Sequence, residues 1–169
     1  MPPAMSDPLL NVVLYQPEIP FNTGSVGRTC VALGAKLWLV RPLGFRVDHH
    51  HLRRGGLDYW EHLDWEVVDD WPSLVDRLPA DSHWRLTKKG ARDYLTADFR
   101  RGDVLLFGPE SRGLPDEILD AEDGRNLRIP TSPLVRSLNL SNSVAIVAYE
   151  ARRQILGSDG LGTGEPGFR

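Results

Sequence analysis

The stretch DVLLFGPESRGLP, residues 103–115, joins an apolar run to a tight, glycine-containing loop. Its first part, 103–108, is continuously apolar after the opening aspartate, which is typical of a strand buried on both faces of a parallel sheet. Two glycines then predict a turn, and Pro115 is well placed to open a helix. The stretch therefore predicts a strand, a loop and a helix in succession.

The same order recurs along the chain. Further apolar runs predict strands at 9–15, 36–41, 65–69, 84–87 and 126–130. Helices are predicted at 23–33, 73–78, 116–121 and 141–155, with Gly34 ending the first and Pro79 ending the second. Because strands and helices alternate, we expect a single α/β domain with a parallel sheet.

The composition is that of an ordinary globular protein. Of the 169 residues, 41% are hydrophobic, and the net charge is −3, so contact with nucleic acid needs a local basic patch.

We expect the domain to span 9–156, with flexible ends at 1–8 and 157–169; both Met1 and Met5 are candidate starts. The single cysteine, Cys30, excludes an internal disulfide and is expected to be a small buried residue. No apolar run is long enough to cross a membrane, so we expect a cytoplasmic protein without a membrane partner.

Ligands of parallel α/β sheets bind beyond the carboxyl ends of the strands, so the loops that follow the strands form the candidate site. Three of these loops are rich in glycine, proline and small polar residues: QPEIPFNTGSVGRTC (16–30), GPESRGLP (108–115) and PTSPLVRSLNLSNS (130–143). None has the Gly-Lys-Ser/Thr ending of a Walker A loop or the G-x-G-x-x-G spacing of a dinucleotide-binding turn. A conventional nucleotide site is therefore not expected, and each loop alone is equally consistent with a capped turn.

Taken together, the loops resemble a known family. The segments NTGSVGRT (22–29), LLFGPESRGLP (105–115) and IPTSPLVRSLNLSNSVAIVAYE (129–150) are similar to the three signature motifs of the SPOUT superfamily of RNA methyltransferases, in its SpoU branch. Three more segments resemble the minimal, single-domain TrmL type: NVVLYQPEIPFNTG (11–24), PLGFRVDHHHLRRGGLDYW (42–60) and LTKKG (86–90). The resemblance covers about residues 10–154.

The resemblance implies a fold, a cofactor and a reaction. The fold is an α/β knot, in which the carboxyl-terminal part of the chain forms a deep trefoil knot, an exception to the rule that chains do not thread loops. The cofactor is S-adenosyl-L-methionine, and the protein is a homodimer. The reaction is 2′-O-methylation of the ribose of the wobble nucleotide, cytidine or uridine, in the anticodon loop of tRNA.

The resemblance also implies a set of cofactor-binding residues. These are Leu86, Gly108, Glu110, Gly113, Ile129, Ser137 and Leu138. Leu86 and Ile129 would form apolar walls for the adenine, although burial preference alone favours ordinary core positions for both. Gly108 would leave room for the cofactor beside the backbone, and Glu110 is expected to bond backbone amides in the second motif loop.

The candidate catalytic residues lie in the first and third motif loops: Asn22, Arg28, Ser141 and Asn142. Asn22 is expected to stabilise the first loop and to cap its helix, and Ser141 or Asn142 to cap the last helix. Arg28 would hold an RNA phosphate near the reacting hydroxyl, because an arginine is too strongly protonated to be a convenient base. The identity of the general base stays open, and a helix-surface role for Arg28 is the alternative.

The expected RNA contacts are basic residues and one tyrosine: Arg46, Arg53, Arg54, Lys88, Lys89, Arg112, Arg136, Tyr149, Arg152 and Arg153. Packing is an equally good explanation for Tyr149. A nucleobase turned out of the loop would stack on Phe45 or Trp60. The run DHHH (48–51) is not expected to bind a metal, since adjacent histidines do not easily converge on one ion.

Two other functions stay open. The first is methylation of a different tRNA position or of ribosomal RNA, although the relatives that do this often carry an additional amino-terminal RNA-binding domain, and none is evident here. The second is a non-catalytic RNA-binding module, against which the presence of Arg28 together with all three loops argues. The sequence specifies neither the tRNA isoacceptors nor a preference between cytidine and uridine.

Overall fold

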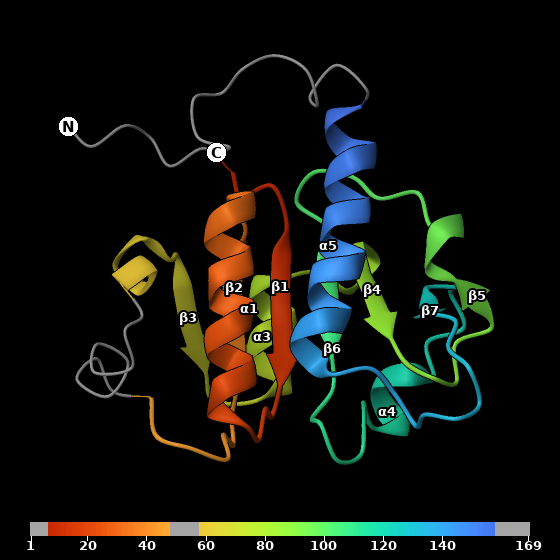
Figure 1. The fold of residues 1–169 in the computed structure, drawn as a ribbon, viewed down its shortest axis with the longest axis horizontal. Helices are drawn as coiled ribbons and strands as arrows, with labels where there is room; N and C mark the ends of the chain where they lie inside the picture. Colours follow the sequence, from red (N-terminus) through yellow and green to blue (C-terminus); the bar gives the residue numbers. More distant parts are fainter. Residues whose placement is uncertain (1–6, 48–57, 158–169) are drawn as a thin grey trace.

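The computed structural model describes residues 7–47 and 58–157, shown in Figure 1. Its strands are β1 (Asn11–Tyr15), β2 (Lys36–Val40), β3 (Trp65–Val68), β4 (His83–Leu86), β5 (Arg92–Asp93), β6 (Val104–Phe107) and β7 (Asn126–Arg128). The α-helices are α1 (Pro20–Leu33), α3 (Trp71–Arg77), α4 (Asp116–Leu119) and α5 (Leu140–Leu156). Short 3₁₀ helices lie at η1 (Asp58–His62), η2 (Ala80–Ser82) and η3 (Tyr94–Thr96).

The seven strands form one sheet in the order β3-β2-β1-β6-β4-β7-β5. All neighbouring strands are parallel; Val12 of β1, for example, lies opposite Leu37 of β2 on one side and Leu105 of β6 on the other. The predicted α/β class with a parallel sheet is therefore confirmed. Strand β5 was not predicted, because an edge strand of two residues leaves no apolar pattern in the sequence.

Each face of the sheet has its own core. Val12 points toward the face covered by α1 and α5, and Val13 points toward the face covered by α3 and α4. Because successive side chains of a strand point to opposite faces, a strand covered on both faces needs apolar residues throughout. This explains the continuous apolar runs in the sequence.

The starts of two helices differ from the prediction. Helix α1 begins at Pro20 rather than at residue 23, its N-cap is Ile19, and Asn22 therefore lies inside the helix instead of capping it. Helix α5 is capped by Asn139, whose side chain accepts hydrogen bonds from the amides of Ser141 and Asn142. The predicted caps at Asn22 and at Ser141 or Asn142 are therefore wrong, whereas Gly34 does end α1 as predicted.

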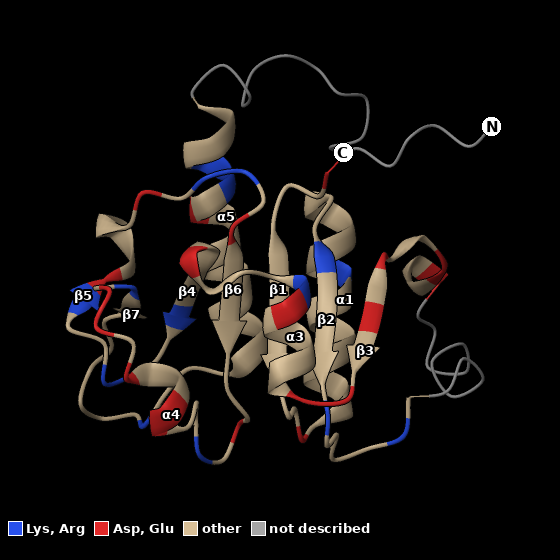
Figure 2. Cartoon of the chain, turned by 180° about the vertical axis from the view of Figure 1, so that it is seen from behind, with Lys and Arg blue, Asp and Glu red and all other residues tan. Residues whose placement is uncertain are grey.

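The parallel arrangement brings the loops after β1, β4, β6 and β7 to one edge of the sheet. Helix α5 starts at this edge and runs beside α1 across the sheet toward the opposite edge (Figure 1). Basic and acidic residues both occur in the loops around α4 at the carboxyl edge (Figure 2), so this edge carries no single sign of charge. Within the described ranges, no helix has the length and apolar character needed to span a membrane.

The thiol of Cys30 provides a test of this packing. Cys30 is fully buried between α1 and the sheet, and burial raises the pKa of its thiol to about 12. Because the thiolate is the reactive species, we expect no reaction with Ellman's reagent under native conditions and one reactive thiol per chain in denaturant. Rapid reaction of the folded protein would contradict the described packing of α1.

Candidate active site

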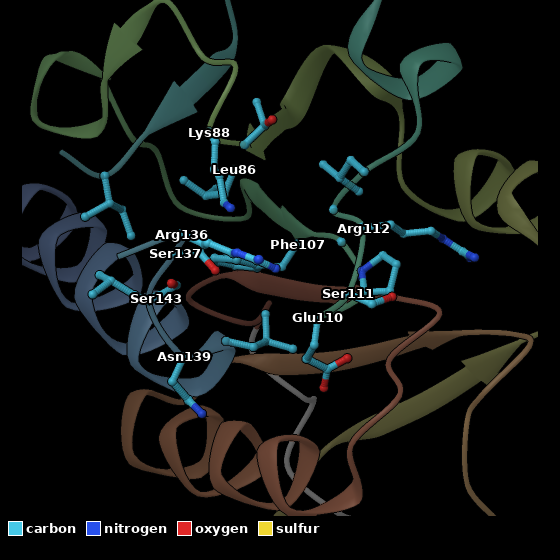
Figure 3. Close-up of a pocket in the computed structure, with 18 of the residues that line it drawn as sticks. Leu86, Lys88, Phe107, Glu110, Ser111, Arg112, Arg136, Ser137, Asn139 and Ser143 are labelled. Carbon is cyan, nitrogen blue, oxygen red and sulfur yellow. The ribbon is translucent and has the colours of Figure 1, made fainter. Parts of the chain in front are cut away.

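A cavity of about 590 Å³ lies at the carboxyl edge of the sheet. Four segments line it: the start of α1, the loop after β4, the loop after β6, and the segment that leads from β7 into α5. Figure 3 shows side chains from these segments, among them Leu86, Phe107, Glu110 and Ser137, arranged around the opening. Three of these segments are the loops that the sequence singled out, and the fourth contains the LTKKG segment.

All seven residues that were predicted to bind the cofactor line this cavity: Leu86, Gly108, Glu110, Gly113, Ile129, Ser137 and Leu138. Leu86 and Ile129 are half-buried, so each exposes part of its apolar surface to the cavity rather than lying fully in the core. Phe107, at the end of β6, extends this apolar wall. The cavity therefore offers apolar surface on its walls and polar groups in its loops.

Glu110, which lies in the second motif loop, holds the first motif loop in place through hydrogen bonds. Its carboxylate accepts hydrogen bonds from the backbone amides of Glu18 at 2.8 Å and Ile19 at 3.1 Å, and from the side-chain amide of Asn22 at 3.2 Å. Glu110 therefore bonds backbone amides, but the prediction that these belong to the second motif loop is wrong, because they belong to the first. A carboxylate that accepts several N–H groups is firmly oriented, since such charge-assisted bonds are stronger than neutral ones.

The third loop joins the same network through Asn139. Its side-chain amide donates to Asn22 Oδ1 at 3.0 Å, while its Oδ1 accepts from the amide and the hydroxyl of Ser141 at 2.9 and 2.6 Å. Glu110, Asn22, Asn139 and Ser141 thus connect all three loops. The small polar residues at the start of α5 satisfy its first amides and connect it to α1, although Ser137, Asn139 and Asn142 are themselves exposed.

Gly108 is required for a reason that the sequence did not predict, in addition to its place beside the cavity. A Cβ atom at this position would lie 2.2 Å from Leu114 N and 2.3 Å from Gly113 C. The backbone of its own loop folds back tightly and fills the space on one side of Gly108. Gly108 also lines the cavity. A larger residue here would displace the 113–114 backbone.

Four basic side chains lie at the cavity: Lys88, Lys89, Arg112 and Arg136. Lys89 Nζ lies 2.9 Å from Asp116 Oδ1, and this hydrogen bond raises the pKa of the lysine. Arg112 donates to the side chain of Gln16. Lys88 and Arg136 are exposed, and Figure 3 shows them on the same side of the opening, so they provide positive charge at the mouth.

Arg28 is not part of this cavity wall. It is exposed on α1, and its guanidinium carbon lies 4.8 Å from the centre of the Tyr59 ring in η1. Ser141 and Asn142, in the first turn of α5, also lie outside the set of lining residues. Of the four predicted catalytic residues, only Asn22 lines the cavity.

The other predicted RNA contacts are dispersed. Arg152 and Arg153 lie near the end of α5, away from the carboxyl edge where that helix starts, and Arg153 is paired with Glu150 at 2.8 Å. Tyr149 is exposed on the same helix, and Arg46 is exposed after β2. Arg53, Arg54 and the histidine run at 48–51 lie outside the described residues.

The two candidate stacking residues have different environments. Trp60 is only 5% exposed and packs against Leu63, so the prediction that it stacks on a nucleobase is wrong. Phe45 is half-buried. No cluster of three metal-ligating side chains occurs among residues 7–47 and 58–157.

Sequence reasoning did not assign roles to Thr87, Phe107 and Ser143, all of which line the cavity, and it expected Asn139 to serve backbone and ligand groups without predicting that it caps α5. A signal for the cap was present, because an asparagine directly ahead of an apolar helical pattern is typical of an N-cap. Phe107 had no such signal, because a residue that ends a buried strand looks the same whether it faces the core or a cavity.

We expect Glu110→Ala to lower the free energy of unfolding by about 1–3 kcal/mol, because the amides of Glu18 and Ile19 lose their acceptor. Glu110→Gln should cost less, since one acceptor oxygen remains. Urea denaturation measures both, with Ser111→Ala as the control that removes only an exposed hydrogen bond to Glu18. An alanine variant no less stable than this control would show that the carboxylate does not hold the first loop.

Known proteins match this chain over most of its length. Residues 9–149 match the model of the SpoU rRNA Methylase family. The tRNA (cytidine(34)-2′-O)-methyltransferase of Methylovorus glucosotrophus is 46% identical over 147 residues, which cover 86% of this chain and 96% of that protein.

Solved structures agree with these matches. One, described as "Structural insights into the 2-OH methylation of C/U34 on tRNA", has a TM-score of 0.81 and 47% identity, and the match covers 88% of this chain and 97% of that one. The SpoU methyltransferase AviRb from Streptomyces viridochromogenes, solved in complex with the cofactor AdoMet, has a TM-score of 0.74 and 26% identity over 88% of this chain and 58% of its own. With its parallel sheet, its three joined loops and these matches, the chain belongs to the SpoU family of RNA methyltransferases.

Proposed function

We propose that this protein transfers a methyl group from S-adenosyl-L-methionine to the ribose 2′-hydroxyl of nucleotide 34, the wobble position, of tRNA. The observation that carries this proposal is the match over nearly the whole chain to relatives named tRNA (cytidine(34)-2′-O)-methyltransferase. A solved structure described for 2-OH methylation of C/U34 on tRNA also matches. The cavity at the carboxyl edge supplies a site of suitable size and chemistry. This substrate places the protein in the cytoplasm, as a partner of tRNA.

The cavity fits S-adenosyl-L-methionine. Its volume lies within the range of small-molecule sites, and its walls combine apolar and polar groups as such sites do. Leu86, Ile129 and Phe107 provide surface for the adenine, and Ser137 provides a hydroxyl at the same opening. The cofactor supplies a methyl group that is already activated by its positive sulfur, so the protein has to bind, align and assist the removal of a proton.

The knot that the family implies is part of this proposal. The segment between β7 and α5 lines the cavity together with the loops after β4 and β6, and α5 then lies against α1 near the beginning of the chain. This close meeting of segments that are distant in sequence is what a threaded carboxyl-terminal segment requires. The hydrogen bond from Asn139 to Asn22 joins the start of α5 to the start of α1, as a threaded arrangement would need.

Arg28 is the proposed contact for the RNA phosphate next to the reacting hydroxyl. Its guanidinium has several N–H donors in one plane, which suits a phosphate better than a single ammonium group does. The guanidinium stays protonated, so its role is to hold the phosphate and stabilise negative charge while the hydroxyl loses its proton. Asn22 and Glu110 keep the helix that carries Arg28 in a defined place.

The proposal includes a homodimer. Helices α1 and α5 lie side by side on the outer face of the sheet, and they expose the apolar side chains of Phe21, Ile146 and Tyr149. A second copy packed on this face would bury these side chains. Arg28 is exposed and does not line the cavity of its own chain. In the dimer, the Arg28 of one copy would lie toward the cavity of the other copy.

Deleting the gene should remove the 2′-O-methyl group from nucleotide 34 of tRNA, as measured by nucleoside mass spectrometry.

We expect Arg28→Ala to bind S-adenosyl-L-methionine normally in calorimetry but to lose methyl transfer by about a hundredfold or more, because a group used only in the transition state is missing. Arg28→Lys should rescue little, since the planar fork is lost. Full activity of Arg28→Ala would refute this role, and unchanged methylation after deletion would refute the substrate.

Mixed dimers test whether Arg28 acts on the partner's cavity. Gly108→Val should distort the cavity through the 113–114 backbone, and Arg28→Ala should remove the phosphate contact, so each variant alone should be inactive. If the two are unfolded and refolded together in equal amounts, about a quarter of wild-type activity should return, because half of the dimers are mixed and each has one complete site. No recovery would place Arg28 at the cavity of its own chain, and sedimentation as a monomer would refute the dimer.

A further inference from the structure

Arg28 has an unusual neighbour in η1, a short helix that precedes β3 in the chain. Its guanidinium carbon lies 4.8 Å from the centre of the Tyr59 ring, a distance typical of a cation–π contact. Arg28 is exposed and Tyr59 is half-buried against the core under α1 and α5. The ring is thus a firm surface on which a long, flexible side chain rests.

The Tyr59 ring is itself anchored to α1. Its hydroxyl donates a hydrogen bond of 2.7 Å to the carbonyl oxygen of Gly24, four residues before Arg28. In a regular α-helix this carbonyl is also the acceptor for the amide of Arg28, so the hydroxyl is attached at the same helical turn that the arginine occupies. Burial raises the pKa of the Tyr59 phenol, which therefore stays protonated and able to donate.

The residue after Tyr59 strengthens this attachment. Trp60 is buried and packs so closely on α1 that a Cβ atom at Gly27 would lie 2.6 Å from its ring. Tyr59 and Trp60 therefore contact consecutive turns of the helix that carries Arg28. Both belong to the segment LDYW (57–60), which is part of the resemblance to the family; the sequence predicted nucleobase stacking for Trp60 and no role for Tyr59.

Contact with a ring has a chemical consequence that contact with a carboxylate does not have. The ring attracts the charge of the guanidinium as a whole and, apart from the Tyr59 hydroxyl, offers no acceptor that would occupy its five N–H donors. The side chain is restrained while other N–H donors stay available for a phosphate. A carboxylate partner would occupy the same donors that the phosphate needs.

We propose that Tyr59 is a positioning residue for methyl transfer, which acts by holding the Arg28 guanidinium on its ring in the orientation that receives the RNA phosphate. The inference rests on the proposed role of Arg28 in the reaction. It assigns to η1 the task of supporting the middle of α1, while the Glu110 network holds the beginning of the same helix.

Two substitutions of Tyr59 separate the ring from the hydroxyl. Tyr59→Leu removes both, and we expect kcat to fall by about tenfold, the size of a lost cation–π contact of moderate strength, with KM for S-adenosyl-L-methionine unchanged. Tyr59→Phe keeps the ring, so it should retain at least about a third of the wild-type kcat. Tyr94→Leu is the matched control, because Tyr94 is also half-buried against the same core but belongs to η3.

The decisive comparison combines Tyr59→Leu with Arg28→Ala. If Tyr59 acts through Arg28, the double variant should be no less active than Arg28→Ala alone, since residues that act as a unit are not additive. A further loss in the double variant, or a wild-type kcat for Tyr59→Leu, would overturn the inference. A fully active Arg28→Ala variant would refute the proposed role of Arg28. An inactive Arg28→Ala variant together with a fully active Tyr59→Leu variant would refute only the role of Tyr59.

A spectroscopic measurement tests the contact without activity. In the folded protein, the Arg28 Nε–H proton should show a ring-current shift in NMR spectra of arginine-labelled protein, assigned by its absence in Arg28→Ala. The shift should persist in Tyr59→Phe and Tyr94→Leu and disappear in Tyr59→Leu. Its absence from the wild-type protein, or its persistence in Tyr59→Leu, would overturn the inference.

Discussion

The carboxylate of Glu110 holds together parts of the chain that are about ninety residues apart, and the site is built around it. Two backbone amides at the start of α1 and the side chain of Asn22 all donate to this one group. The amide of Ile19, the N-cap residue of α1, has no partner within the helix, and Ile19 offers no side-chain cap. A carboxylate from the second motif loop therefore supplies an acceptor at the point where the first loop enters α1.

The rest of the site depends on where this places Asn22. Inside α1, rather than at its cap, Asn22 donates to Glu110 and accepts from Asn139, which in turn caps α5. Three loops and the starts of two helices thus share one hydrogen-bond network beside the cavity. Small amides and hydroxyls suit this place, since they satisfy several buried or half-buried groups without filling the space that a ligand would take.

The cavity and Arg28 lie at different places along α1. The cavity lies at the carboxyl edge, where the loop after β6 and the segment leading into α5 provide its walls. Arg28 lies further along α1 and rests on Tyr59 of η1, outside the cavity wall. The residues predicted to bind the cofactor therefore gather in one place, whereas the predicted catalytic residues do not.

The sequence by itself determined the α/β class and the parallel sheet, because continuous apolar strands and glycine-containing loops are local patterns. The resemblance to the family added the positions of seven of the residues that line the cavity. It did not determine the cap of α5 at Asn139, the burial of Trp60 or the reason for Gly108. The cap at Asn139 is a local contact, for which Ser141 and Asn142 were equally plausible candidates in the sequence. The other two depend on a segment that the fold packs against the residue: the backbone of 113–114 closes on Gly108, and α1 closes on Trp60. Such close contacts are decided by tertiary structure. The type of a side chain determines which contacts it is able to make, but only the folded chain determines which partners lie within reach.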